Sequence, residues 1–415
     1  MDASRAIRYY PERMKRNTLL IVVVAIAGIF LLFDPLKYIR GNRKAVQKPP
    51  LSAPAVASLL EFAGANFRTP EDYVISTFAS RDVVFLGEFY KIRQNVQLVS
   101  ALVPRLYAAG VRNLGIEFAL SDDQKDIDAL VTAPQWSEEK ARAITFDWLV
   151  TWGYQEYIDI YKAAWQLNRS LAAGAKPFRV VGLNLRQNWE ALKSEKDLAD
   201  PETVAKVLAY GVPDANMAEV IDREFVRRGE KALVYCSIQH AFTRYRSAEY
   251  EKNAASMKLP ETRRAGNIVY AAIGSRAFTI SLHSPWPDKG EQSGFSFPVD
   301  GSIDALIDAL PEGRKSAGWN TEGTPLGRLP VRPGTYAAEG QEMTLSELCN
   351  GYIVQGPIAE YQPVTPIVGF VRPEDAEKAS RNFPGSKQGT MTADQVNKLI
   401  VDDAEAMRKL FVQFR

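Results

Sequence analysis

The chain has 415 residues, of which 46% are hydrophobic and 24% charged, and its 51 Lys and Arg against 49 Asp and Glu give a net charge of +2. This composition is typical of a folded protein and excludes disorder across the chain, and the near-neutral balance argues against a nucleic-acid-binding protein. Two cysteines exclude a disulfide scaffold, and two histidines, His240 and His283, exclude a site that needs three imidazoles from one chain.

An apolar run near the N-terminus predicts a membrane anchor. A basic tail, 1–17, precedes an apolar segment, 18–36, and no small-residue cleavage site follows it, which favours a signal anchor over a cleaved signal peptide. Segment 37–54 is basic and then rich in proline, as in a linker that lies close to anionic lipid head groups. We therefore expect a single-pass membrane protein. Lys and Arg flank the run on both sides, so the positive-inside rule leaves its orientation open.

From residue 55 to residue 415 the sequence predicts one α/β domain with a mostly parallel sheet flanked by helices, because short β-branched runs alternate with helical periodicity. We expect strands at 83–86, 114–116, 178–181, 232–235 and 351–355, and helices at 95–109, 154–171, 216–228 and 392–414.

Two later segments of this domain have their own patterns. The runs 267–273 and 277–282 are separated by only three residues, which predicts an antiparallel hairpin at the sheet edge. Segment 284–345 is rich in Gly, Pro and Ser, which indicates a loop-rich insertion with one short helix near 303–310.

Four of the predicted strands run into polar or ionisable side chains. Glu88 and Glu117 follow the first two strands, Asn184 and Arg186 follow the third, and His240 follows the fourth. In open α/β sheets the ligand crevice lies outside the carboxyl ends of the parallel strands. The sequence therefore predicts that these five side chains surround one pocket.

This set of residue types suits the activation of water and the stabilisation of an anion, which is the chemistry of hydrolysis. Two neighbouring carboxyl groups cannot both ionise freely, so one is suited to acid or base work. The hypothesis is that Glu88 and His240 activate water, Glu117 orients it, and Arg186 stabilises negative charge. The alternative is a polar network that only caps the sheet, with Arg186 in a buried ion pair.

Four short motifs in the predicted order resemble those of the ChaN-like, Tiki and erythromycin-esterase superfamily, over roughly residues 80 to 285. They are Gly87-Glu88-Phe89-Tyr90, Gly115-Ile116-Glu117-Phe118, Val181-Gly182-Leu183-Asn184 and Ser237-Ile238-Gln239-His240-Ala241. Two positions depart from the pattern: Tyr90 stands where that superfamily usually has a histidine, and Ser237 where it has a glycine.

The resemblance implies that Glu88, Glu117 and His240 occupy site positions. Members of this superfamily are linked to ester hydrolysis, metal-dependent proteolysis and haem binding, and many lie outside the cytoplasm. The resemblance thus implies a small-molecule or peptide substrate and an extracytoplasmic C-terminal domain, and it leaves open a divalent metal or haem as cofactor. With Tyr90 in place of the usual histidine, a metal site would have one imidazole only.

Further residues have two interpretations each. Tyr90 is either a donor to an oxyanion or a tyrosinate ligand of haem iron. Asn95 would line the pocket entrance, and His283 either reaches the same rim or is structural. Trp148 and Trp152 belong to an aromatic cluster that forms either core or a wall for a planar ligand. The alternatives to a hydrolase are therefore a haem-binding protein and a relative that has lost its activity.

The chain lacks several common catalytic motifs. It has no His-Glu-x-x-His, no Cys-x-x-Cys, no Gly-x-x-x-x-Gly-Lys and no Gly-x-Ser-x-Gly. Standard zincins, P-loop nucleotide-binding proteins and serine hydrolases with a nucleophile elbow are therefore disfavoured.

Overall fold

The computed structural model describes residues 46, 48, 53–194, 197, 200–288, 294–333, 336–337, 340–383 and 389–415. The predicted tail (1–17), the predicted anchor (18–36) and most of the predicted linker (37–54) lie outside the described residues. Within the described ranges, no helix combines the length and the apolar character that crossing a bilayer requires.

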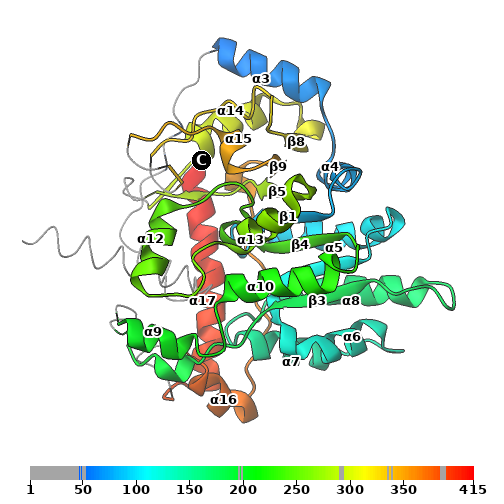
Figure 1. Ribbon diagram of the computed structural model, residues 1–415, viewed down its shortest axis with the longest axis vertical. Coiled ribbons are helices and arrows are strands. Elements are labelled where there is room, and N and C mark those ends of the chain that lie inside the picture. The colour runs from blue at the N-terminus through cyan, green and yellow to red at the C-terminus, as the bar shows by residue number, and fades with distance from the viewer. Residues whose placement is uncertain are drawn as a thin grey trace, which may run out of the picture.

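A seven-stranded sheet forms the centre of the molecule, with strand order β3-β2-β4-β1-β5-β9-β8 (Figure 1). Neighbouring strands are parallel except β8, which pairs antiparallel with β9 at one edge. The prediction of a mostly parallel α/β sheet is confirmed. The strands are β1 (Val83–Glu88), β2 (Asn113–Leu120), β3 (Arg179–Asn184), β4 (Ala232–Ser237), β5 (Ala277–Leu282), β8 (Ser316–Asn320) and β9 (Gly351–Gln355).

The antiparallel hairpin is not where the sequence predicts it. The first of its two expected strands is helix α13 (Ala265–Ile273), and the second is β5, which lies inside the sheet between β1 and β9. Antiparallel pairing occurs instead between β8 and β9 and in the small pair β6 (Trp286–Pro287) and β7 (Phe295–Ser296). The prediction is wrong at this point because Ile268 and Val269 suit a strand locally but lie on a helix that packs on the sheet.

Helices cover both faces of the sheet, and α17 runs along the molecule from α16 to the C-terminus (Figure 1). The helices are α3 (Ala53–Ala65), α4 (Pro70–Thr77), α5 (Arg93–Ala108), α6 (Gln124–Thr132), α7 (Glu138–Trp148), α8 (Gln155–Ser170), α9 (Pro201–Val207), α10 (Pro213–Ile221), α11 (Ile238–Ala241), α12 (Ala248–Ser256), α14 (Ser302–Ala309), α15 (Leu345–Leu348), α16 (Ala376–Arg381) and α17 (Ala393–Phe411).

Alternation along the buried strands divides the core into two halves. Val84 and Leu86 of β1 face a cluster that includes buried residues of α4 to α8 and α17, and Val83 and Phe85 face a cluster that includes α3, α10, α13 and α14. Every residue of β1 is buried, as is normal for a central parallel strand covered on both faces. The carboxyl ends of these strands are therefore held rigidly between two packed layers.

Within 284–345, the short helix expected near 303–310 is present as α14, but the segment also contains β8, which the sequence analysis missed. The reason is composition: β8 reads Ser-Ala-Gly-Trp-Asn and offers no β-branched residue. Its place in the sheet comes from its pairing with β9, not from local preference.

Candidate active site

Three neighbouring strands bring the acidic and imidazole side chains to one edge of the sheet. β4 lies between β2 and β1, and the register pairs Glu88 at the end of β1 with Ser237 at the end of β4. Helix α11 follows β4 immediately and carries His240. The close arrangement of Glu88, Glu117 and His240 therefore follows from the strand order.

Gly87 allows α11 to approach the end of β1. A Cβ atom at this position would lie 2.5 Å from Cδ1 and 2.9 Å from Cα of Ile238. Both distances are too short for a real contact, so any side chain here would push α11, and with it His240, away from the strands. The absence of a side chain at Gly87 is therefore what allows α11 to pack this close to the strand.

Glu88 is fully buried and accepts hydrogen bonds from two tyrosines. The Tyr157 hydroxyl donates to Oε1 at 2.9 Å, and the Tyr235 hydroxyl donates to Oε2. Burial raises the pKa of Glu88 well above its usual range, and this effect outweighs the two tyrosine hydrogen bonds, which favour the ionised form. Burial therefore favours the neutral form of Glu88.

Glu117 is the centre of the cluster. The Tyr90 hydroxyl donates to Oε1 at 2.6 Å, the Ser237 backbone N–H donates to Oε2 at 2.7 Å, and His240 Nε2 lies 3.5 Å from Oε1. Tyr90 and Ser237, the two departures from the superfamily pattern, therefore both hold this carboxylate. His240 faces Glu117, whereas the sequence analysis paired it with Glu88.

His240 lies between two carboxylates. Its Nδ1 is 2.7 Å from Oδ1 of Asp214, a buried residue in the first turn of α10. Burial opposes the charged imidazolium, but the charges of Asp214 and Glu117 outweigh burial and raise the pKa of His240 above its usual value of 6.5. His240 is therefore suited to carry and donate a proton near neutral pH.

Asp214 holds the far side of this network. The Ala265 N–H donates to Oδ1 at 2.7 Å, and Arg264 Nη1 donates to Oδ2 at 3.2 Å. Burial alone would raise the pKa of Asp214, but the positive charges of His240 and Arg264 lower it to about 2. Arg264 is itself buried and lies over the ring of Tyr250, 3.3 Å from its centroid. Asp214 is thus an ionised group that fixes the orientation of the imidazole.

A layer of aromatic rings covers the carboxyl groups. Tyr90 packs edge-to-face against Phe118 and Trp152, with ring centroids 5.8 Å and 5.4 Å away, and Trp148 packs against Trp152 at 4.9 Å. Tyr157 joins the same layer through Phe118. The aromatic cluster is therefore core and also the cover of the polar network.

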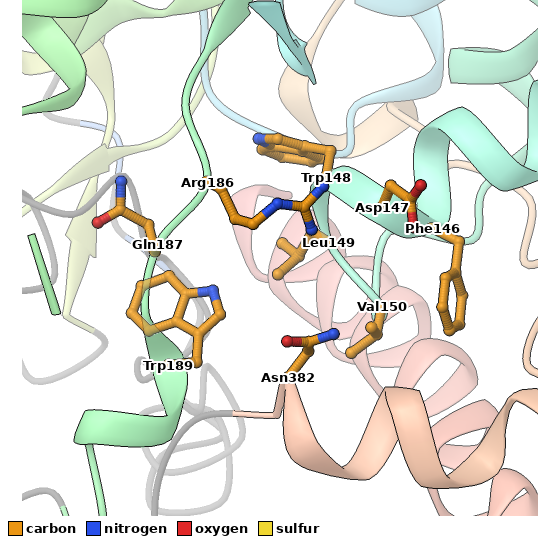
Figure 2. A pocket seen from close by; sticks show the side chains of 9 residues that line it. All are labelled: Phe146, Asp147, Trp148, Leu149, Val150, Arg186, Gln187, Trp189 and Asn382. Atoms are coloured by element: carbon orange, nitrogen blue, oxygen red, sulfur yellow. The ribbon is translucent and has the colours of Figure 1, made fainter. Parts of the chain in front are cut away.

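Trp148 is one of the residues that line a narrow pocket (Figure 2). Its volume is about 10 Å³, which is close to the space that one water molecule needs. Arg186 lines it and points toward the Trp148–Leu149 segment in Figure 2, and Asp147 and Gln187 line it as well. Arg186 follows β3, the strand at the sheet edge, and lies in this pocket together with Trp148.

Asp123, near this pocket, gives a prediction on stability. Burial and then the Asp147 carboxylate raise the pKa of Asp123 to about 6, against the charge of Arg186. A carboxyl whose folded pKa is raised loses stability as pH rises from its usual value of 3.8 through about 6. Asp123→Asn should therefore raise the unfolding free energy at pH 8 by up to about 1 kcal/mol, since solvent screens this half-exposed group, and should change little at pH 4. Urea unfolding at both pH values measures this, and an equal effect at both would contradict it.

Two other expected site residues serve local structure. Asn184 accepts the N–H of Leu185 on its own side-chain oxygen at 2.9 Å, at the edge of the sheet. Asn95 is buried in α5 and accepts a hydrogen bond from Gln355 Nε2 at 2.7 Å. The structure therefore ties Asn95 to the end of β9, away from the Glu117 cluster.

His283 belongs to a separate buried group. Its Nδ1 is 2.9 Å from the Tyr352 hydroxyl and its Nε2 is 3.2 Å from Oδ1 of Asp304. It follows β5, which lies on the opposite side of β1 from β4, so its partners come from β9 and α14. The structure thus brings together Glu88, Tyr90, Glu117 and His240 and leaves out Arg186, Asn184, Asn95 and His283.

The described residues do not fit a haem ligand set at Tyr90. Its side chain is buried under Trp152, and its hydroxyl donates to Glu117. An iron ligand would have to replace that hydrogen bond and displace the aromatic cover. Among the described residues there is also no group of three His, Cys, Asp or Glu side chains arranged to hold a metal ion.

Sequence reasoning missed Asp214 and Arg264. Pro213 and Asp214 have the pattern of an ordinary helix start, with proline in the first turn and an acidic residue beside the helix N-terminus. Arg264 similarly precedes a segment expected to be a strand. Nothing local distinguishes these two residues, because their role comes from contacts across the fold.

No protein-family profile matches the chain, and no curated protein matches it. Among solved structures it is similar to a succinoglycan biosynthesis protein, with a TM-score of 0.52 and 10% identity over 76% of this chain and 100% of that one. It also matches erythromycin esterase EreC (TM-score 0.44, 12% identity, 75% of this chain and 96% of that one). A third match is haem-binding ChaN of Campylobacter jejuni (TM-score 0.34, 13% identity, 54% of this chain and 89% of that one). With the first of these structures the likeness reaches a shared fold.

Proposed function

We propose that the protein is a hydrolase of a carboxylic ester, lactone or peptide bond, in which Glu117 and His240 transfer the protons. The observation that carries the proposal is the buried series Asp214–His240–Glu117. His240 Nδ1 lies 2.7 Å from Oδ1 of Asp214, and His240 Nε2 lies 3.5 Å from Oε1 of Glu117. An imidazole that is oriented by one carboxylate and faces a second is a common arrangement for acid and base catalysis.

The proton transfers balance within this pair. Glu117 accepts a proton from water as the water oxygen bonds to the carbonyl carbon. The bond from that carbon to the leaving oxygen or nitrogen then breaks, and the leaving atom takes a proton from His240 Nε2. Glu117 afterwards returns its proton to His240 across the 3.5 Å gap, which restores the starting state. Asp214 takes no proton and acts by positioning the ring.

Tyr90 has a second role in this proposal. Burial, followed by the Glu117 charge, raises the pKa of Tyr90 well above its usual value, so the hydroxyl keeps its proton. It can therefore turn from Glu117 to donate to the negative oxygen that forms on the substrate. This would give Tyr90 a use at the position where the superfamily usually has a histidine.

Access requires the aromatic cover to move. Glu117 is fully buried. Trp148, which lines the narrow pocket, packs against Phe118 and Trp152 of the aromatic cover, so the rings connect this pocket with the site. We therefore place substrate entry on the Trp148 side, where Arg186 and Asp147 would meet it first. Under this proposal Arg186 acts at the entrance, whereas the sequence analysis placed it at the reacting bond.

The test is a substrate screen with matched variants. Purified full-length protein is assayed against p-nitrophenyl esters, lactones and short peptides. Glu117→Gln and His240→Gln should each lower kcat/KM by roughly 10²- to 10⁴-fold on any active substrate. Because the mechanism needs the imidazolium, kcat should fall as pH rises through the raised pKa of His240, above 6.5.

The control is Glu377→Gln, an exposed residue of α16. It should leave kcat/KM unchanged, and all variants should keep the circular dichroism spectrum of the wild type. Activity that survives both Glu117→Gln and His240→Gln would refute the mechanism. A Soret band on haem addition that Tyr90→Phe abolishes would favour the alternative of a haem-binding protein.

A further inference from the structure

A second, larger pocket of about 440 Å³ lies beside α13. Arg244, Arg246 and Arg263 line it together with Thr243, Asn267 and Tyr270. The volume lies within the range of small-molecule sites. Among the described residues that line it, three are cationic and none is acidic.

Two of the arginines are oriented by glutamates that do not line the pocket. Arg246 donates through Nε and Nη2 to Glu251 at 2.5 and 3.0 Å. Arg263 donates through Nε and Nη2 to Glu261 at 3.0 and 2.8 Å. These paired bonds leave Nη1 of each guanidinium without an acceptor among the described residues. The two groups are therefore pre-oriented and can still donate to a ligand.

Arg244 carries the least compensated charge of the three. Its Nη2 donates to the neutral carbonyl of Ser346 at 2.7 Å, and its nearest carboxylate, that of the exposed Glu322, is 3.9 Å away. A solvent-exposed pair at this distance neutralises little. An anion in the pocket would therefore gain most from Arg244.

The loop that carries Arg244 and Arg246 is held against α13. Asn267 Nδ2 lies within hydrogen-bond distance of three backbone carbonyls, those of Phe242, Thr243 and Tyr245, at 2.8 to 3.0 Å. A Cβ atom at Gly266 would lie 2.4 Å from the Phe242 carbonyl oxygen, so the glycine permits this close approach. The backbone that carries Arg244 and Arg246 is therefore fixed, which lowers the conformational entropy that ligand binding would cost.

We propose that this pocket binds a small-molecule anion through a phosphate or carboxylate group held by Arg244, Arg246 and Arg263. Planar guanidinium groups donate in pairs to both kinds of oxyanion, and Tyr270 supplies an apolar wall for the remainder of the ligand. The site is distinct from the Glu117 cluster, although Arg263 adjoins Arg264, which holds Asp214. The proposal does not depend on hydrolysis.

Calorimetric titration of the full-length protein with inorganic pyrophosphate, and separately with citrate, tests this site. At least one probe should bind, and Arg244→Ala should weaken binding about tenfold or more. The affinity should also fall as sodium chloride is raised, because charges at a partly open pocket are screened. The comparison of the two probes separates phosphate from carboxylate recognition.

Arg276→Ala is the matched control, since this arginine is exposed and pairs with Asp82 at the opposite end of the sheet. It should leave binding unchanged, and unfolding midpoints should show that both variants fold. The proposal is overturned if neither probe binds the wild type, or if Arg244→Ala binds as tightly as Arg276→Ala.

Discussion

Replacing Asp214 by asparagine is expected to lower the free energy of unfolding by about 3 to 5 kcal/mol at pH 7, because it removes a buried carboxylate that contacts two buried cations. In the wild type, Asp214 contacts His240 Nδ1 at 2.7 Å and Arg264 Nη1 at 3.2 Å. Arg264 is buried and keeps its proton, so in the variant its Nη1 would face a neutral amide in place of a carboxylate. Urea or thermal unfolding of the two proteins measures the difference.

The pH dependence of this effect has a definite sign. A carboxyl whose folded pKa is lowered stabilises the protein above its usual pKa, 3.8, and this contribution is lost as pH falls through its folded value, about 2. The gap between wild type and Asp214→Asn should therefore narrow by about 2 kcal/mol between pH 5 and pH 2.

The matched control is Glu219→Gln, an exposed acidic residue on the same helix, α10. It should change the unfolding free energy by less than about 0.5 kcal/mol. If Asp214→Asn is equally mild, Asp214 does not hold the buried cations as described, and the positioning of His240 would need another explanation.

Substitutions of Glu88 should give the second large change in the free energy of unfolding. Two of them separate the contribution of the size of the side chain from that of its charge. Glu88→Ala leaves a cavity and removes the acceptor of the Tyr157 and Tyr235 hydroxyls, which should cost about 3 to 5 kcal/mol. Glu88→Gln keeps the shape and a neutral acceptor, so at pH 5 it should cost about 1 kcal/mol or less. The reason is that burial raises the pKa of Glu88 and so favours the protonated form, which carries no charge that glutamine would lack.

The contribution of Glu88 to stability should change with pH in the opposite direction to that of Asp214. A carboxyl with a raised folded pKa loses stability as pH rises above its usual value of 4.5 until the folded pKa is reached. Glutamine does not ionise, so Glu88→Gln should become progressively more stable relative to wild type as the pH is raised above 5. Glu312→Gln, at a highly exposed position, should show no such trend. A loss for Glu88→Gln that grows with pH would mean that Glu88 is ionised.

Much of the fold is predictable because its signals are local. The expected strands at 83–86, 114–116 and 232–235 are short apolar runs, and all three are strands of the observed sheet. Glycines also mark helix ends correctly, as at Gly110 after α5, where φ is +82°. Such signals depend on neighbouring residues only, so they survive in the folded chain.

The candidate site is predictable in part, for the same reason. Glu88, Glu117 and His240 each follow or end an apolar strand, and carboxyl ends of parallel strands meet at one edge. This rule does not give the order of the strands in the sheet, and that order decides which of the expected side chains lie next to one another. His283 follows β5 on the far side of β1, so its partners are Tyr352 and Asp304 and not the cluster. Arg186 follows the edge strand β3 and lines the pocket beside Trp148.

The sequence by itself determined the fold class, the presence of two acids and one imidazole at a common sheet edge, and the resemblance that goes with them. Only the tertiary structure decided that Glu117 faces His240, that Tyr157 and Tyr235 hold Glu88, and that Asp214 and Arg264 complete the network. Periodicity and composition reflect interactions between neighbours in the chain, whereas the contact between Ser237 and Glu117 spans 120 residues. Contacts of that kind are set by the order of strands and the packing of helices on them, which no local pattern contains.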